Sequence, residues 1–332
     1  MRSIVSTSLT TLLIPTTPPP IVPKSIVCTV FEGRYHLGVG ALANSLYGSG
    51  YRGVLYAGYR GELPPWATPA TTEANGNTTF RVADGLDLYF ARQDTDEMLA
   101  NIKPDLMQQV WEHYGEALEY VFYIDCDIVI KAKWAHFEDW ARYGVALCED
   151  MNSPVPVHSP LRQRWREYYA KYGVDYVAKD DVYVNGGFVG IHRDYRGFAA
   201  LWDRLQVHMK EYTGKQHRSI GIADRWNPFH YMDQDALNVA KDLTPHISVM
   251  GPQAMDFGRH GYVMSHAAGV RKPWDIAYLR DIIAEGARPS FADKHYWHHV
   301  DGPITLFSRA TVVRKRLALR AASFIGRFFT RV

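Results

Sequence analysis

Short apolar runs alternate along this chain with segments whose apolar residues recur at helical spacing. Residues 25–31 (SIVCTVF) and 53–59 (GVLYAGY) are rich in β-branched and aromatic side chains, which favour strands. Between them, residues 38–50 (GVGALANSLYGSG) predict a helix that ends at glycine. A strand, a helix and a second strand in this order predict a parallel pair joined by a crossover, so we expect an α/β fold.

The same pattern continues through most of the chain. Further strands are predicted at residues 78–82, 86–90, 119–125 and 182–191, and further helices at 104–114, 161–173, 195–212 and from Asp233 onward. The strand at 119–125 (EYVFYID) is almost continuously apolar, as expected of a central strand covered on both faces. Residues 213–230 predict a loop that is longer than most connections, which favours a functional role.

Composition indicates a globular protein with one large domain. Of the 332 residues, 47% are hydrophobic and 22% charged, which excludes a largely disordered or fibrous chain. We expect a flexible proline-rich extension at 1–24, an α/β domain at 25–290 and a basic amphipathic segment at 291–332. The three cysteines are too scattered for a disulfide framework, and neither a secretion signal nor a membrane span is indicated. We therefore expect a cytoplasmic location.

The formal net charge of +2 hides an uneven distribution. Residues 309–332 hold seven of the 37 basic side chains and no acidic one, so the preceding residues carry 30 basic against 35 acidic side chains. In this segment a shared apolar stripe is predicted for Val313, Leu317, Phe324, Phe328 and Val332. Such a helix suits the inner surface of an anionic membrane; the alternative is a helix packed on the body by those same residues. Nucleic-acid binding is not expected, because no aromatic stacking platform accompanies the charge.

Two carboxylates stand where the central strand ends. Asp125 and Asp127 form a D-x-D motif at its carboxyl end, the edge at which ligands bind in open α/β sheets. Period-two alternation places both on one side of the chain, where hard oxygen ligands can hold Mg²⁺ or Mn²⁺ together with phosphate oxygens. A solvated strand end or a helix cap is the alternative interpretation.

Two further motifs carry polar groups or glycines at unusual places. Gly186 and Gly187, after Asn185, weaken a predicted strand unless something approaches the backbone closely, so they indicate either a β-bulge or the floor of a sugar site. Asp233 and Gln234 belong to a polar cluster (DQDALN) at the start of a helix. One acid there is explained as an N-cap, whereas a carboxylate beside a carboxamide suits recognition of sugar hydroxyls.

The fourth motif is HAAGVRKPW. His266 could complete a metal site that two carboxylates begin, Lys272 could neutralise phosphate, and Gly269 would let backbone amides approach an anion. A histidine satisfied in the core and a surface lysine are the alternative. The remaining histidines, including His295 and His299, have no carboxylate pattern beside them and are taken as structural.

In this order, YVFYIDCD, VNGGFVGI, DQDALN and HAAGVRKPW resemble the signature of glycosyltransferase family 8, which includes bacterial lipopolysaccharide galactosyl- and glucosyltransferases and glycogenin. The resemblance runs from about residue 25 to 274. It implies a GT-A fold, with a Rossmann-like, mostly parallel sheet flanked by helices. It also implies a UDP-sugar donor, Mn²⁺ (or Mg²⁺) dependence, and transfer of a hexose with retention to a glycan, glycolipid or other cell-surface acceptor.

The resemblance also implies roles for individual residues. The metal ligands would be Asp125, Asp127 and His266, and the diphosphate would be contacted by Lys272 near Gly269. The donor sugar and its reacting carbon would lie against Asn185, Gly186, Gly187, Asp233 and Gln234, with Lys103 close to the donor. The uridine would be cradled by Thr29, Phe31 and Tyr35.

Two departures from the family pattern concern the acceptor side. The glycine strand reads NGGF where the family more often has N-A-G, and the predicted loop at 213–230 lengthens the next connection. Two other functions remain as alternatives. A nucleotidyltransferase making a nucleotide sugar would need a glycine-rich phosphate loop, of which VFEGRYHLGVG offers only a faint version. A non-catalytic nucleotide-sugar-binding protein is the second.

Overall fold

The computed structural model describes residues 23–72, 76–214 and 221–328. Nearly all of the predicted extension at 1–24 lies outside these residues, as do part of the 213–230 loop and Val332. Of the described part of that loop, Thr213 is the last residue of a helix, whereas 221–230 form turns and bends with neither helix nor strand, as predicted.

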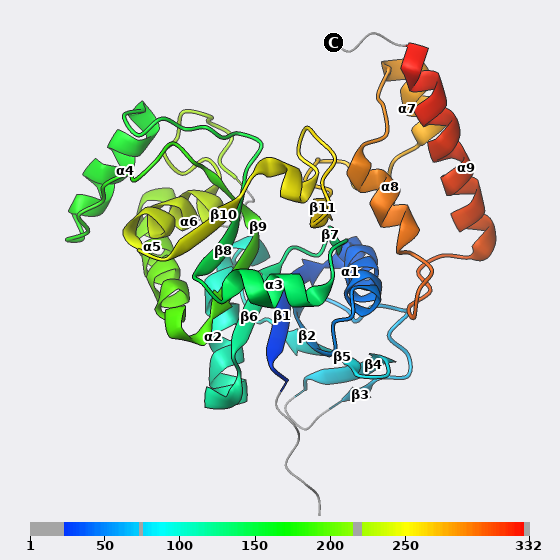
Figure 1. The fold of residues 1–332 in the computed structure, drawn as a ribbon, viewed down its shortest axis with the longest axis horizontal. Coiled ribbons are helices and arrows are strands. Elements are labelled where there is room, and N and C mark those ends of the chain that lie inside the picture. The colour runs from blue at the N-terminus through cyan, green and yellow to red at the C-terminus, as the bar shows by residue number, and fades with distance from the viewer. Residues whose placement is uncertain (1–22, 73–75, 215–220, 329–332) are drawn as a thin grey trace, which may run out of the picture.

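A nine-stranded mixed sheet forms the centre of the described structure (Figure 1), in the order β10-β8-β9-β6-β1-β2-β5-β4-β3. Its strands are β1 (Ser25–Glu32), β2 (Gly53–Arg60), β3 (Thr71–Thr72), β4 (Thr78–Ala83), β5 (Leu86–Arg92), β6 (Tyr120–Ile124), β8 (Val145–Glu149), β9 (Val184–His192) and β10 (Ile247–Met250). β1 pairs with both β2 and β6 in parallel, which confirms the predicted α/β fold.

The sheet is mostly parallel, with two strands reversed. β4 runs antiparallel to β5, and β9 runs antiparallel to both β6 and β8. Because β9 is reversed, its first residues lie beside the last residues of β6. Asp125 N–H accordingly donates to Gly187 O at 2.8 Å.

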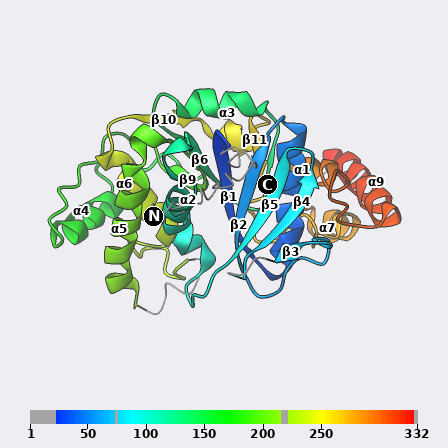
Figure 2. The ribbon, with the colours of Figure 1, turned by 90° about the horizontal axis from the view of Figure 1, so that it is seen from below.

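Helices cover both faces of the sheet (Figure 2). They are α1 (His36–Gly48), α2 (Lys103–Tyr114), α3 (Trp134–Ala141), α4 (Pro160–Ala170), α5 (Gly197–Thr213), α6 (Met232–Leu243), α7 (Tyr278–Glu285), α8 (Phe291–His298) and α9 (Arg309–Ile325). Because side chains alternate along a strand, β1 serves two cores. Ile26 and Cys28 pack with α2, α5 and α6, whereas Val27 and Phe31 pack with α1 and α3.

A third core joins the last three helices to α1, at the end of the molecule opposite α4 (Figure 1). Within it, α9 buries Val312, Leu319 and Ala322. The predicted stripe residues Val313 and Leu317 are at least half exposed. The alternative interpretation, in which α9 packs on the body through that stripe, is therefore wrong: the helix packs through its opposite face. No helix in the described ranges has the length and apolarity needed to cross a bilayer.

Candidate functional site

A short two-stranded sheet brings together residues that lie far apart in the sequence. β7 (Ile128–Ile130) follows the D-x-D motif and pairs antiparallel with β11 (Met264–His266), so that His266 lies opposite Ile128. Ala267 N–H donates to Asp127 O at 3.1 Å and continues this pairing past the strand. The predicted carboxylate pair and the predicted histidine therefore meet at the carboxyl end of β6.

The three side chains form a compact donor set. His266 Nε2 lies 3.2 Å from Asp127 Oδ1 and 3.7 Å from Asp125 Oδ2. One donor atom from each residue lies within 4.8 Å of the other two. His266 Nδ1 is buried without a hydrogen-bond partner among the described residues, whereas Nε2 faces the two carboxylates. Two carboxylate oxygens and one imidazole nitrogen suit a divalent ion such as Mn²⁺, so the residues fit a metal site.

Lys272 lies against the second carboxylate. Its Nζ is 2.6 Å from Asp127 Oδ2 and donates to Ala267 O at 2.8 Å. Burial alone would raise the pKa of Asp127, but His266 and Lys272 outweigh it and lower the pKa. Burial likewise lowers the pKa of Lys272, and Asp127 outweighs it, so the pKa rises. Both groups are therefore charged at neutral pH.

Lys103 lies at the centre of the other half of the site. Its Nζ donates to Asp233 Oδ2 at 2.7 Å and to Gly186 O at 3.0 Å, and it lies 3.2 Å from Asp125 Oδ1. Burial lowers the pKa of Lys103, but the carboxylates of Asp125 and Asp233 outweigh burial and raise it. Burial raises the pKa of Asp233, and Lys103 offsets this only in part. One buried cation thus joins the candidate metal site to the start of α6.

The two glycines of β9 make room for these side chains. A Cβ on Gly187 would lie 2.7 Å from His266 Cε1 and 2.9 Å from Asp125 Oδ2, closer than real Cβ contacts. A Cβ on Gly186 would lie 3.0 Å from Asp233 Oδ2. Close approach of the chain's own side chains thus favours glycine at both positions. The floor of a sugar site stays a prediction.

The start of α6 is fixed by its own polar side chains. Its N-cap residue is Tyr231, so the expectation that an aspartate caps it is wrong. Instead, Asp235 accepts from Tyr231 N–H at 2.8 Å and from Tyr183 OH at 2.7 Å. Burial raises the pKa of Asp235 well above its usual value. Gln234 Oε1 accepts from Gly186 N–H at 2.9 Å, which fixes its carboxamide beside β9.

The three residues assigned to the uridine lie in different surroundings. Thr29 is fully buried, and its Oγ1 has no hydrogen-bond partner among the residues described. The Phe31 ring stacks on Tyr59 within the core, so this side chain does not face a ligand. The Tyr35 ring is partly exposed and lies 5.7 Å from Lys272 Nζ. Only Tyr35 therefore presents its side chain beside the charged cluster.

Three further residues belong to the description of the site: Gly269, which was predicted, and Asp150 and Tyr123, which were not. Gly269 is exposed, and a Cβ there would meet nothing closer than 3.8 Å, so packing does not require glycine. Asp150 was not predicted; it is buried after β8 and accepts from Asn185 Nδ2 at 2.6 Å. Its position at a strand's carboxyl end was the available signal. Tyr123 was also missed, and its OH donates to Asp125 Oδ1 at 2.8 Å.

No family model matches the sequence, and no curated protein does. Among solved structures, similar chains include the bifunctional glycosyltransferase WbbM (13% identity, TM-score 0.46, 90% of this chain and 53% of that one). Another is the galactosyltransferase LgtC in complex with donor and acceptor sugar analogues (16%, 0.47, 86% and 98%). A third is the glycosyltransferase GlyE of Streptococcus pneumoniae (14%, 0.47, 88% and 63%). This chain thus spans about half of WbbM and under two thirds of GlyE.

Proposed function

We propose that the protein is a glycosyltransferase that moves a hexose from a UDP-sugar to an acceptor hydroxyl, assisted by a divalent metal and with retention at the anomeric carbon. The observation that carries the proposal is the convergence of two half-sites. Asp125, Asp127 and His266 present metal donors, and Lys103 joins them to Asp233 at the start of α6. A UDP-sugar carries a diphosphate next to a sugar. The diphosphate fits the half-site with the metal donors, and the sugar fits the half-site around Asp233.

The metal half would stabilise the leaving group. A divalent cation bound by Asp125, Asp127 and His266 would supply Lewis-acid stabilisation to the UDP as it departs. Lys272 is already charged and sits 2.6 Å from Asp127, close enough to neutralise a diphosphate oxygen. Its alkyl chain is largely buried, so the ammonium is held at the site before a ligand arrives.

The other half would hold the sugar. Asp233 Oδ2 is held by Lys103, and Gln234 is oriented by Gly186 N–H. These oxygens would bind sugar hydroxyls and stabilise the positive charge that grows on the anomeric carbon. Asn185, held between Gly187 N–H and Asp150, would lie beside the donor sugar, where the acceptor hydroxyl must also approach.

The product of the reaction distinguishes this proposal from its alternatives. UDP-glucose, UDP-galactose and their N-acetylated forms would each be incubated with the protein and Mn²⁺, without acceptor, and the products separated. Glycosyl transfer predicts slow, Mn²⁺-dependent release of UDP and free sugar from one donor. A nucleotidyltransferase would leave these donors intact and would instead release pyrophosphate from UTP and a sugar 1-phosphate, which a separate incubation supplies. Binding of UDP and Mn²⁺ by calorimetry without turnover of any donor or acceptor would identify a binding protein.

A further inference from the structure

The last helix has two apolar faces, and the body of the protein covers only one. Through Val312, Leu319 and Ala322, α9 packs into the third core. Two of its basic side chains also serve this packing. Lys315 donates to Ile276 O at 2.6 Å, and Arg316 Nη2 donates to Asp301 Oδ1 at 2.6 Å. These contacts fix which way the helix is turned.

The opposite face of α9 is apolar and open. Exposure is 50% for Val313, 59% for Leu317 and 58% for Phe324, and it is 77% for Phe328 in the 3-10 turn (Gly326–Phe328) that follows α9. At about 100° of rotation per residue, Val313, Leu317 and Phe324 lie within one sector of the helix. Large apolar residues this exposed are expected singly on a surface, whereas here they form a continuous row.

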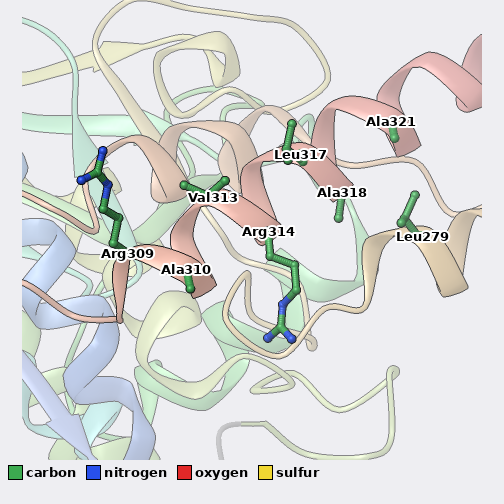
Figure 3. A pocket seen from close by; sticks show the side chains of 8 residues that line it. All are labelled: Leu279, Arg309, Ala310, Val313, Arg314, Leu317, Ala318 and Ala321. Atoms are coloured by element: carbon green, nitrogen blue, oxygen red, sulfur yellow. The ribbon is translucent and has the colours of Figure 1, made fainter.

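Helix α7 widens this row into a shallow groove. Leu279 and Ile283 are 41% and 69% exposed. Leu279 lines one groove with Val313, Leu317 and Ala318, which Figure 3 shows between the two helices. We refer to Leu279, Ile283, Val313, Leu317, Phe324 and Phe328 as the α7/α9 face.

Arginines border the α7/α9 face without acidic partners. Arg309, Arg314 and Arg320 are exposed and make no ion pair with any described residue. In Figure 3 the side chain of Arg309 extends from one end of the groove, and that of Arg314 extends from α9 midway along it. The nearby acids of α7 are already engaged, since Arg271 bonds to both Asp281 and Glu285. The border of the face is therefore positively charged.

We propose that the α7/α9 face binds an anionic lipid bilayer. The apolar row would enter the boundary between headgroups and acyl chains, and the arginines would contact lipid phosphates. Self-association through the same face would bring the arginines of two copies together, so charge favours a lipid surface over a second copy. This proposal goes beyond glycosyl transfer and does not depend on it.

Vesicle sedimentation tests the proposal on the full chain. Wild-type protein is expected to bind phosphatidylcholine vesicles that contain phosphatidylglycerol and to bind pure phosphatidylcholine more weakly by about tenfold or more. Leu317→Glu and Ile283→Glu, on separate helices, should each reduce binding to the anionic vesicles by about tenfold or more, because each places a carboxylate in the apolar row. Val207→Glu is the matched control, since Val207 is 49% exposed on α5, outside this face. It should bind like wild type.

A triple variant, Arg309→Gln, Arg314→Gln and Arg320→Gln, tests the charges separately. It should lower binding to anionic vesicles and weaken the salt dependence of binding. Circular dichroism and light scattering of every variant report fold and oligomeric state. The proposal is overturned if wild-type protein ignores anionic vesicles, or if the two glutamate variants bind as the Val207→Glu control does. It is also overturned if those variants only convert a dimer to a monomer, because the face would then be a self-interface.

Discussion

Lys103 is the residue on which the two halves of the candidate site depend. Its ammonium is buried between Asp125 and Asp233, so removing it leaves the largely buried carboxylate of Asp233 and the partly buried one of Asp125 without this counter-ion. Breaking a buried pair by deleting one partner typically costs about 3–5 kcal/mol. Replacing Lys103 should therefore lower both the activity of the site and the stability of the protein.

Replacing Lys103 by methionine is expected to lower turnover of the donor by about 100-fold or more. The same variant should unfold at a lower temperature than wild type, as measured by calorimetry. Lys103→Arg retains the charge and serves as the control, with partial activity and a smaller loss of stability. If Lys103→Met turned over the donor as fast as wild type does, Lys103 would have no part in the reaction.

Gly187 tests the geometry of the donor set. In Gly187→Ala, the new Cβ would meet His266 and Asp125 at under 3.0 Å, so the ligands must move apart. We expect Mn²⁺ affinity, measured by calorimetry, to fall by about tenfold or more. Gly197→Ala at the start of α5 is the control, because nothing lies within 4 Å of its added Cβ and it should bind Mn²⁺ normally. Equal affinity in both variants would contradict the assigned site.

At the scale of elements, the helices and strands that depend on local pattern were predictable. β1, α1 and β2 follow from apolar runs and a terminal glycine, and the structure has them at nearly the predicted bounds. The reversal of β9 was not predictable, because strand direction depends on the path of a long connection through α4. That reversal is what places Gly187 beside Asp125, so the site's assembly could not be derived from spacing alone.

At the site, too, contacts between residues far apart in the sequence could not be predicted. The motifs identified Asp125, Asp127, Asp233 and His266 as polar groups at element ends. The bond from Lys103 to Asp233 crosses 130 positions, and no local signal predicts it. A side chain's direction is equally non-local, which is why Phe31 was assigned to a ligand although its ring packs in the core.

The two faces of α9 predict opposite responses to similar mutations. Leu319→Ala removes a side chain that is 7% exposed and should cost about 2–3 kcal/mol in the free energy of unfolding. Leu317→Ala, two residues earlier, should change it by less than about 0.5 kcal/mol, since the side chain is 59% exposed. Denaturant titrations measure both. A larger cost at Leu317 than at Leu319 would mean that α9 is turned the other way.

For the whole molecule, stability should depend on pH through two histidines near the third core. Burial, followed by nearby positive charge from Lys131, lowers the pKa of His295 to about 4. Burial and the neighbouring His298 lower the pKa of His299 to about 4. An unfolded histidine has a pKa of about 6.5, so between these values the unfolded chain binds more protons than the folded one. Stability should therefore fall as the pH decreases from about 6.5 to about 4.

The slope of that loss is at most about 1.4 kcal/mol per pH unit for each histidine. Replacing His295 and His299 by glutamine should flatten the dependence in this window, as measured by denaturant titrations at several pH values. His136→Gln, on α3, is a control outside the third core and should leave the slope unchanged. An unchanged slope in the double variant would show that other groups control acid stability.

Asp125, Asp127 and His266 are proposed to hold the metal that assists transfer from a UDP-sugar. The most direct test compares wild type with Asp127→Asn, which keeps the side chain's size and removes its charge. We measure Mn²⁺-dependent release of UDP from the preferred donor. We expect a loss of about 100-fold or more in the variant, with its circular dichroism unchanged. Full Mn²⁺-dependent turnover by Asp127→Asn would show that these residues do not hold the metal.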